Sequence, residues 1–545
     1  MKYRDMIVPP TQTERADERQ VKNSAGGYVY KVGAAEQMRR FLVLGTEGGT
    51  FYASQKDLTK VNLDNLKALA ASDPFVYITV LEEADQQNIA PRHSTVLLAL
   101  AVLYAHNDKE AVRTWVKQNF TKTVRTGTHL FEFVDYVTQW RGWGRGLRSL
   151  VASWYTEKEP DDLAYQVVKY RQRGGWSHRD LLRKAHPVVQ GEGQKRVLDY
   201  VTHGTLHFGG EGGTEVLDEQ VIAQFEAVKA STLEPEKATA LSWEMLPTES
   251  LTDSAVWRAL IAGRGRLPYT AMLRNLGRMT SIGVFDDADI MRDVATRLAD
   301  PDNLKRARVH PFNILTALKT YSSGGGFRGS LTWTPVQRLV DALDTAFYVS
   351  FDNVEATGKR INIALDVSGS MGATLMNSNV TAREGSTAMA LASLSADPDT
   401  TDTIAFTAGG WTAPGQGRGW FRHGGITELG LSTRRRMDDI VNETARLPFG
   451  STDCALPIVW AMAQKKVYDA FVIYTDNETW AGNVQPMDAL RTYRAQVNRD
   501  ARLIVVGMTS TGFSIGDPED KGCLDVVGFD SSAPSLISNF IAGKF

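Results

Sequence analysis

Cysteine is nearly absent from this chain, which has two, Cys454 and Cys523, among 545 residues. Two cysteines cannot build a disulfide scaffold, and this excludes the small secreted folds that depend on one. Long apolar runs are also missing. The N-terminal sequence MKYRDMIVPP has no apolar core long enough for a signal peptide, and the longest apolar run, 96–105, is too short to span a bilayer. We therefore expect a cytoplasmic protein with no membrane partner.

Net charge is small as well, at −2 for the whole chain. The charges are unevenly distributed, because residues from 361 onward carry a net −5 and the remainder a net +3. Within the remainder, residues 110–190 hold 14 Lys and Arg against 8 Asp and Glu. A near-neutral total can conceal a local patch, so the composition does not exclude a polyanionic partner for residues 110–190.

The chain divides into three parts by pattern. Residues 1–27 are polar and contain Pro9 and Pro10, which predicts an extended arm. Glycines break two apolar, β-type runs in 41–52, which predicts a small hairpin there. From about residue 58 to 350 the pattern becomes short amphipathic helices joined by Gly, Pro, Asn or Ser. Helices this short must stack to bury their apolar faces, which predicts an α-solenoid or irregular bundle, although no clean repeat is visible.

After Gly358 the pattern becomes β-α, which predicts a doubly wound domain over 361–545. The predicted strands are 361–366, 403–406, 470–475 and 502–507, and the predicted helices are 385–394, 433–445, 455–465 and 485–497. A glycine-rich segment with two Trp and two Arg, 409–425, interrupts the pattern. It is either a flexible surface loop or a loop that stacks on RNA or binds a partner.

The most informative motif follows the first of these strands. In INIALDVSGSMG, residues 361–372, a buried strand ends at Asp366, and Ser368 and Ser370 follow on a loop with two glycines. Carboxylates and hydroxyls at alternating positions supply the oxygen ligands that Mg²⁺ requires. The spacing D-x-S-x-S resembles the metal-ion-dependent adhesion site of von Willebrand factor A-type domains. One such motif alone is weak evidence, because Ser and Asp are common turn formers.

Two later segments complete that pattern. Thr452 lies on a loop before an apolar helical run, and Asp476 ends the apolar strand FVIYTD. If the two strands are parallel neighbours, Asp476 lies beside Asp366, at the sheet edge where ligands of open α/β sheets bind. We therefore predict a divalent metal cation, Mg²⁺, held by Asp366, Ser368, Ser370, Thr452 and Asp476. The alternative is that these are ordinary capping residues.

The densest basic segment, KYRQRGGWSHRDLLRKAH at 169–186, contains Lys169, Arg173 and His178. Lys169 and Arg173 share a helical face if the helix extends that far. A second cluster contains Arg125, His129, Arg141, Arg145 and Arg148, with the sequence RGWGRGLR placing Arg beside Trp. Arg binds phosphates in a bidentate manner and stacks on bases. The pattern is equally typical of solvated helix surfaces, and His178 could simply form a local hydrogen bond.

Several longer segments resemble a known family. RRFLVLGTEGGTFY at 39–52, KYRQRGGWSHRDLLR at 169–183, LRNLGRMT at 273–280 and HPFNILTALKTY at 310–321 are similar to the TROVE module of the Ro autoantigen family. DVSGSM at 366–371, GSTDCALP at 450–457 and YTDNET at 474–479 resemble its A-type domain. The resemblance covers nearly the whole chain.

The resemblance implies a multidomain α + α/β protein. A ring of HEAT-like helical repeats, the TROVE module, would span 28–358, and a Rossmann-like von Willebrand factor A-type domain would span 361–545. In this family Y-type RNAs bind the outer basic surface, single-stranded 3′ ends of misfolded RNAs enter the ring, and residues matching Lys169, Arg173 and His178 contribute to RNA binding. The implied role is RNA quality control beside an exoribonuclease, without enzymatic activity and without a DNA partner.

Two alternatives to RNA binding follow from the metal motif. A metal-dependent protein-interaction module would use a partner's carboxylate to complete the cation's shell, and it could coexist with RNA binding. A metal-dependent nuclease would need a cluster of carboxylates bridging two ions. The motif offers two acids, Asp366 and Asp476, among hydroxyls, and no general base is apparent, so the nuclease is disfavoured.

Overall fold

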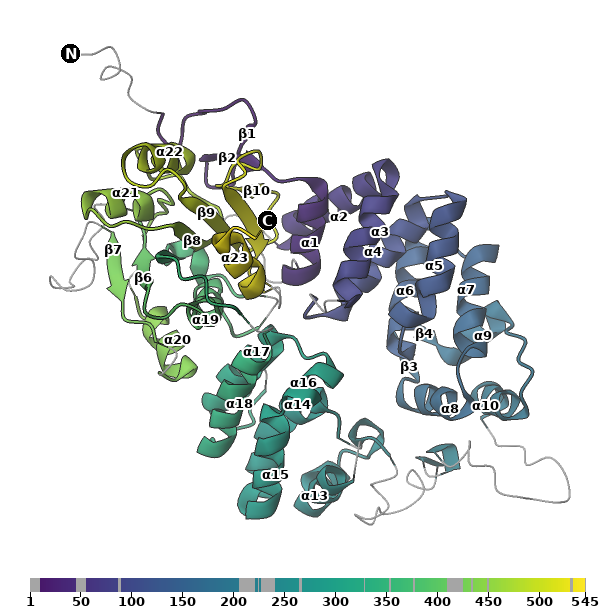
Figure 1. Cartoon of the computed structure of the whole chain (residues 1–545). Helices are drawn as coiled ribbons and strands as arrows, with labels where there is room; N and C mark the ends of the chain where they lie inside the picture. The colour runs from purple at the N-terminus through teal and green to yellow at the C-terminus, as the bar shows by residue number, and fades with distance from the viewer. Residues whose placement is uncertain are drawn as a thin grey trace, which may run out of the picture.

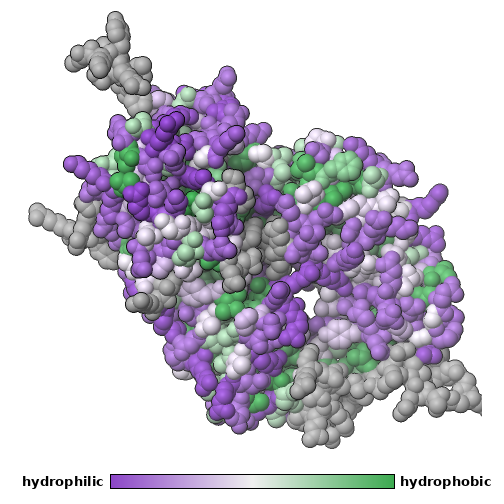
Figure 2. Space-filling model, in the orientation of Figure 1, coloured by the Kyte–Doolittle hydropathy of each residue, from purple (hydrophilic) through white to green (hydrophobic). Residues whose placement is uncertain are grey.

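The computed structural model describes residues 10–45, 55–86, 90–204, 221–223, 225–226, 241–263, 267–327, 329–351, 354–375, 378–408, 425–432, 435–447, 450–529 and 533–544. The chain leaves a sheet domain, follows an arc of helices, and returns through a second group of helices to the same domain (Figure 1). Figure 2 shows the surface hollowed between the two groups of helices. The described parts thus form a ring that the sheet domain closes.

The first group of helices in the ring comprises α1 (Ala34–Leu44), α2 (Gln55–Ser72), α3 (Pro74–Gln86), α4 (His93–His106), α5 (Glu110–Thr123), α6 (Gly127–Arg141), α7 (Arg145–Thr156), α8 (Pro160–Lys169), α9 (His178–Ala185) and α10 (Glu192–His203). The second comprises α13 (Ser254–Ala262), α14 (Tyr269–Ser281), α15 (Ala288–Ala299), α16 (Pro301–Ala307), α17 (Pro311–Ser322) and α18 (Gln337–Val349). The prediction of short stacked helices is confirmed.

Helix α7 illustrates why these segments are helical. Its buried side chains, Leu147, Leu150, Val151 and Trp154, recur at three- and four-residue spacing and so form one apolar stripe. The stripe packs into a hydrophobic core that is continuous through both groups of helices and reaches one face of the sheet. Because each helix buries its stripe against its neighbours, the ring is held by stacking rather than by a separate core for each repeat.

The N-terminal predictions need correction. Residues 41–44 are not a strand but the end of α1, because Met38 and Leu42 continue a buried helical stripe. The hairpin lies earlier, between β1 (Gln20–Lys22) and β2 (Tyr28–Lys31), and β2 pairs with β10 (Phe513–Ser514). The described part of the predicted arm therefore packs on the sheet domain instead of extending away from it. Residues 46–54 lie outside the described residues.

The doubly wound domain has a six-stranded sheet in the order β11-β9-β8-β5-β6-β7. Its strands are β5 (Ile361–Asp366), β6 (Thr401–Phe406), β7 (Ile426–Leu429), β8 (Ala470–Thr475), β9 (Arg502–Gly507) and β11 (Cys523–Val527), all parallel except β7. The four predicted strands are confirmed, whereas β7 and β11 were not predicted. Strand order reverses between β5 and β8, so the carboxyl ends of these two strands form the edge where a ligand would bind.

Helices cover both faces of this sheet. One face packs against α19 (Ala382–Leu394), α20 (Met437–Ala445) and α23 (Ala533–Ala542), and the other against α21 (Leu456–Ala463) and α22 (Pro486–Gln496). The predicted helices correspond to α19, α20, α21 and α22, with boundaries that differ by up to four residues. Both faces of β5 and β8 are buried, as expected for parallel strands sandwiched between helices.

Polar contacts hold the sheet domain into the ring. Arg40 of α1 is fully buried and donates to the carbonyl oxygens of Thr511 and Phe513 at 3.0 and 2.8 Å. On the other side, Lys319 of α17 forms an ion pair with Glu384 of α19. The sheet domain therefore contacts both ends of the helical arc.

Candidate functional site

The carboxyl ends of β5 and β8 bring the predicted metal ligands together. Asp366, Ser368, Ser370, Thr452 and Asp476 are each at most 2% exposed. The hydroxyl oxygens of Ser368 and Ser370 lie 3.1 Å apart. The backbone amide of Ser368 donates to Asp366 Oδ1 at 2.9 Å, and a 3₁₀ turn, Gly369–Gly372, carries Ser370. This predicted cluster, which we call the metal edge, is therefore assembled by three separate loops.

Two oxygens at the metal edge have no hydrogen-bond partner among the described residues. Thr452 Oγ1 and Asp476 Oδ2 are buried and make no hydrogen bond with the described residues. Burying polar oxygens without partners costs free energy, which a cation could offset by accepting them as ligands. These oxygen donors suit a hard divalent cation such as Mg²⁺. The residues present therefore fit the predicted ion.

The pKa values of the two aspartates at the metal edge also fit a site for a divalent cation. Burial raises the pKa of Asp366, and burial together with the neighbouring Asp366 and Glu478 carboxylates raises the pKa of Asp476 to about 8. Two carboxyl groups in a buried site resist ionising together. Among the described residues no group of three or more His, Cys, Asp and Glu side chains is placed to hold a metal, so hydroxyls dominate this donor set.

Two residues that the sequence reasoning missed support the loops of the metal edge. Arg383 of α19 is 5% exposed, and its guanidinium donates to the carbonyl oxygens of Val367 and Leu447 at 3.1 and 3.0 Å. Gln12, from the N-terminal segment, donates to Asp453 Oδ1 at 2.7 Å. Neither has a local sequence signal, because both act across long sequence separations.

The basic segment 169–186 folds differently from the expectation. Helix α8 ends at Lys169, so Lys169 and Arg173 do not share a helical face. A two-residue hairpin follows, β3 (Gln172–Arg173) and β4 (Trp176–Ser177), and its turn residues Gly174 and Gly175 both have positive φ, at 59° and 82°. Ser177 caps α9 through a capping box with Asp180.

Lys169 and Arg173 also differ in exposure. The Lys169 side chain is 9% exposed and pairs with Glu244 at 2.7 Å. The Arg173 side chain is 60% exposed, and its Nε lies 3.0 Å from Glu132 Oε1. A polyanion can reach Arg173 directly, whereas Lys169 is engaged in a nearly buried ion pair.

His178 does not lie on the exposed positive face, and that expectation is wrong. It is 2% exposed, its ring packs on Phe131 and Trp154, and its Nδ1 lies 2.8 Å from the Tyr155 hydroxyl. Burial lowers its pKa to about 3, so the ring is neutral at pH 7. The exposed histidine of this segment is His186, at the end of α9.

The second predicted cluster separates into three places. Arg125 forms an ion pair with Asp85, and His129 lies nearby with its ring stacked on His93 at 4.5 Å. Arg141 pairs with Asp108 at 2.6 Å. Arg145 and Arg148 are exposed on α7, where Arg148 donates to the carbonyl oxygen of Ala185 in α9 at 3.1 Å.

Exposed cations are carried by α7, by the segment between α8 and α9, and by α9, which packs against α7. We call this set the cationic surface: Arg145, Arg148, Arg171, Arg173, Arg179, Arg183 and Lys184. Two tryptophans lie within it, Trp143 and Trp176, with ring centroids 6.3 Å apart, and Lys184 Nζ lies 5.5 Å from the Trp143 centroid. Cations beside aromatic rings suit phosphates and unpaired bases.

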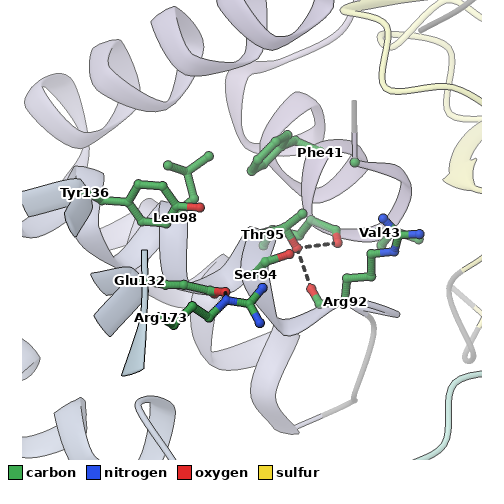
Figure 3. A pocket seen from close by; sticks show the side chains of 11 residues that line it. Phe41, Val43, Arg92, Ser94, Thr95, Leu98, Glu132, Tyr136 and Arg173 are labelled. Atoms are coloured by element: carbon green, nitrogen blue, oxygen red, sulfur yellow. Dashed lines mark hydrogen bonds and ion pairs between the residues drawn. The ribbon is translucent and has the colours of Figure 1, made fainter. Parts of the chain in front are cut away.

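A cavity of about 300 Å³ lies beside this surface, among the end of α1, the start of α4, α6 and β3 (Figure 3). Phe41, Leu98 and Tyr136 contribute apolar and aromatic surface, while Glu132 and Arg173 contribute opposite charges. Burial raises the pKa of Glu132, and the Arg173 guanidinium opposes that effect.

Two further predictions concerned the glycine-rich segment and the membrane. Apart from Gly425, the glycine-rich segment 409–425 lies outside the described residues. Among the described residues, no helix has the length and apolar character needed to cross a bilayer.

Comparison with known proteins agrees with both halves of the architecture. The family model of the TROVE domain matches residues 21–208 and 236–322, and that of the Ro60 vWA domain matches residues 360–541. The fold and the two family models therefore define a TROVE ring closed by an A-type domain.

The chain belongs to the Ro60 family. It is 38% identical to the RNA-binding protein RO60 of Deinococcus radiodurans, over 98% of this chain and 97% of the relative. It is 33% identical to the RNA-binding protein RO60 of Caenorhabditis elegans, over 98% of this chain and 92% of the relative. The crystal structure of the Deinococcus radiodurans RO (RSR) protein superposes with a TM-score of 0.68 at 35% identity, covering 94% of this chain and all of that one.

Proposed function

We propose that the chain is an RNA-binding protein that acts by binding and not by catalysis. The observation that carries this proposal is the cationic surface, whose seven exposed Arg and Lys side chains lie on α7, on α9 and in the segment between α8 and α9, with Lys184 beside Trp143 and Trp176. The relatives named RNA-binding protein support the same role. Phosphate contacts from such a surface supply affinity that is largely independent of sequence.

The finer proposal assigns different RNAs to different places. Y-type RNAs bind the cationic surface, where duplex or bulged RNA can be recognised by its shape. Single-stranded 3′ ends of misfolded RNAs enter the opening between the two groups of helices (Figure 2). An exoribonuclease partner would then act on RNAs that the ring has bound.

A second function is proposed for the metal edge, which is a metal-dependent contact with a protein partner. The hydroxyls of Ser368, Ser370 and Thr452, with Asp366 and Asp476, would hold Mg²⁺ and orient its waters. The unpartnered oxygens of Thr452 and Asp476 favour this function. When bound, the ion would attract an acidic group of a partner. A nuclease is disfavoured because a hydroxyl-rich donor set does not match a two-metal carboxylate site.

Binding at several salt concentrations tests the RNA proposal. The variant Arg145→Ala/Arg148→Ala/Lys184→Ala removes three exposed cations. We expect weaker binding of a structured Y-type RNA and a salt slope that falls by roughly two to three units, because about 0.7 to 0.9 units are lost for each phosphate contact. The measurement is fluorescence anisotropy with labelled RNA.

The matched control removes three exposed cations of the sheet domain, as Lys359→Ala/Arg499→Ala/Lys521→Ala. Both triple variants lose the same charge, so only the place of the loss differs. Equal loss of affinity in the two variants would mean that net charge, and not the cationic surface, drives binding.

A further inference from the structure

The cavity beside the cationic surface is lined by a carboxylate, a group that phosphate binding alone does not need. Glu132 of α6 lines it, although an acidic group repels a polyanion. Its Oε1 is held by Arg173 Nε at 3.0 Å, and its side chain is 20% exposed. A carboxylate kept in place at the edge of a cationic surface is better suited to a hydrogen-bond donor of the ligand than to its phosphates.

The aromatic wall of the cavity is held rigidly. The Tyr136 ring stacks on Trp140, with centroids 6.1 Å apart and planes inclined by 14°, and Lys67 Nζ lies 5.9 Å from the Trp140 centroid. In Figure 3 Tyr136 and Glu132 approach the cavity from the same side, and Phe41 lies across from them. A flat ligand could therefore stack on a ring while its edge faces a carboxylate.

The size of the cavity suits a single base. Its volume of about 300 Å³ is at the lower end of the roughly 300–1,000 Å³ typical of ligand pockets. A whole oligonucleotide would not fit, whereas one unstacked base would. Single-stranded RNA is commonly read in this way, by splaying out a base and binding its edge.

We propose that this cavity binds one unpaired guanine of an RNA strand. Guanine is the RNA base whose Watson–Crick edge carries two adjacent donors, N1–H and the N2 amino group, and both can donate to the Glu132 carboxylate. Uracil places two carbonyl acceptors around its single donor, and adenine and cytosine place a ring nitrogen acceptor beside their amino group. Those acceptors would be repelled by the carboxylate, so the cavity discriminates among bases.

Arg173 completes the site from its rim. One nitrogen of its guanidinium fixes Glu132, and the side chain remains 60% exposed. The exposed end can therefore bind the phosphate next to the inserted guanine, as Arg does at many phosphate sites. The proposal rests on the RNA-binding function, to which it adds a preferred base and a place for it.

Binding of short RNAs to the full chain tests the proposal. The probes are fluorescent oligouridylates that carry one central guanosine, inosine, adenosine or cytidine, with plain oligouridylate as reference. We expect the guanosine probe to bind about tenfold more tightly than the adenosine or cytidine probe, since one good two-bond base contact gives discrimination of that order. Inosine, which lacks the N2 amino group, should fall between.

Two variants assign the effect to the cavity. Glu132→Gln should abolish the guanosine preference and leave the affinity for plain oligouridylate within about twofold, because the phosphate contacts remain. Asp135→Asn is the matched control on the same helix, since it removes one carboxylate that does not line the cavity, and it should keep the preference. Tyr136→Leu should weaken the guanosine probe by about fivefold or more through lost stacking.

The possible failures are distinguishable. Equal affinity of the wild-type chain for all five probes would overturn the guanine site while leaving RNA binding intact. Absence of binding to every RNA would overturn the proposed function itself. A preference that survives in Glu132→Gln would place guanine recognition elsewhere. If that variant does not fold, the wild-type series with inosine still decides the question.

Discussion

The metal edge and the cationic surface are built in opposite ways. At the metal edge five oxygen-bearing side chains from three loops are at most 2% exposed, and each is positioned by the fold. On the cationic surface the charged side chains are exposed, so water can reach them. A buried polar group requires a partner, whereas an exposed one does not.

This difference teaches what each region can recognise. Under the proposed functions, the metal edge would present buried, fixed oxygens to a single small ion, so one misplaced ligand would change the whole site. The cationic surface would present exposed charges to a large polyanion, so each cation would contribute separately and no single one would be decisive. The first two predictions below test this contrast, and the third concerns two buried histidines of the helical region, in order of decreasing effect.

The largest effect should come from replacing an arginine of each region by alanine. Arg383→Ala removes a buried guanidinium and leaves the carbonyl oxygens of Val367 and Leu447 without that donor. We expect the free energy of unfolding to fall by about 3–5 kcal/mol, as for other broken buried charge contacts. Arg148→Ala, which loses one hydrogen bond from α7 to the carbonyl oxygen of Ala185, should cost only about 0.5–1.5 kcal/mol. Urea denaturation of both variants measures the difference.

Similar losses in the two arginine variants would contradict the contrast between the two regions. A change in the slope of the denaturation curve for Arg383→Ala would show that the unfolding is no longer a single transition.

The second prediction concerns Mg²⁺. An ion that binds only the folded state, present at 100 times its dissociation constant, stabilises a protein by about 2.7 kcal/mol. Thr452→Val should abolish that stabilisation. In the absence of metal the same variant should be as stable as the wild type or more so, because Thr452 Oγ1 makes no hydrogen bond with the described residues.

The control for this experiment is Thr316→Val in α17, whose hydroxyl donates to the carbonyl oxygen of Phe312 at 2.8 Å. It should keep the full response to Mg²⁺ in thermal unfolding. A Thr452→Val variant that still responds like the wild type would remove Thr452 from the ligand set.

The sequence could predict the position of a residue where a local pattern determines it. Asp366 and Asp476 end apolar strands, and the carboxyl ends of parallel neighbours meet at one edge, so their proximity could be predicted. Arg383 and Gln12 could not be predicted, because each reaches this edge from a distant part of the chain. Supporting contacts of this kind depend on tertiary packing that no sequence pattern encodes.

In the helical region, composition alone could not predict which basic residues and histidines are exposed. An excess of basic residues in 110–190 predicted a positive surface but could not rank its members. His178 and His186 have similar sequence surroundings, yet the first lies in the core and the second is exposed, because α9 turns its apolar stripe and His178 toward Trp154 and Tyr155. Lys169 is likewise paired with Glu244, which is 75 residues away in the sequence and had no signal.

The smallest predicted effect is the contribution of a single histidine to the acid sensitivity of the helical region. Burial lowers the pKa of both His178 and His129 from 6.5 to about 3, with the neighbouring His93 and Arg125 contributing at His129. The unfolded chain therefore binds protons below pH 6.5 that the folded chain does not. The contribution of these histidines to the free energy of unfolding is therefore fully present above pH 6.5. It is lost as the pH falls toward 3, at roughly 1.4 kcal/mol per pH unit for each histidine.

The variant His129→Phe measures how much one histidine contributes to the pH dependence of the free energy of unfolding. The phenyl ring can keep the stacking on His93, and it removes a ring nitrogen, Nδ1, that has no hydrogen-bond partner among the described residues. Between pH 6.5 and about 5, the loss of stability per pH unit should therefore shrink by roughly 1.4 kcal/mol, the share of one proton. Urea denaturation at half-unit pH steps decides the outcome, and an unchanged slope in His129→Phe would mean that His129 is protonated equally in the folded and unfolded chains.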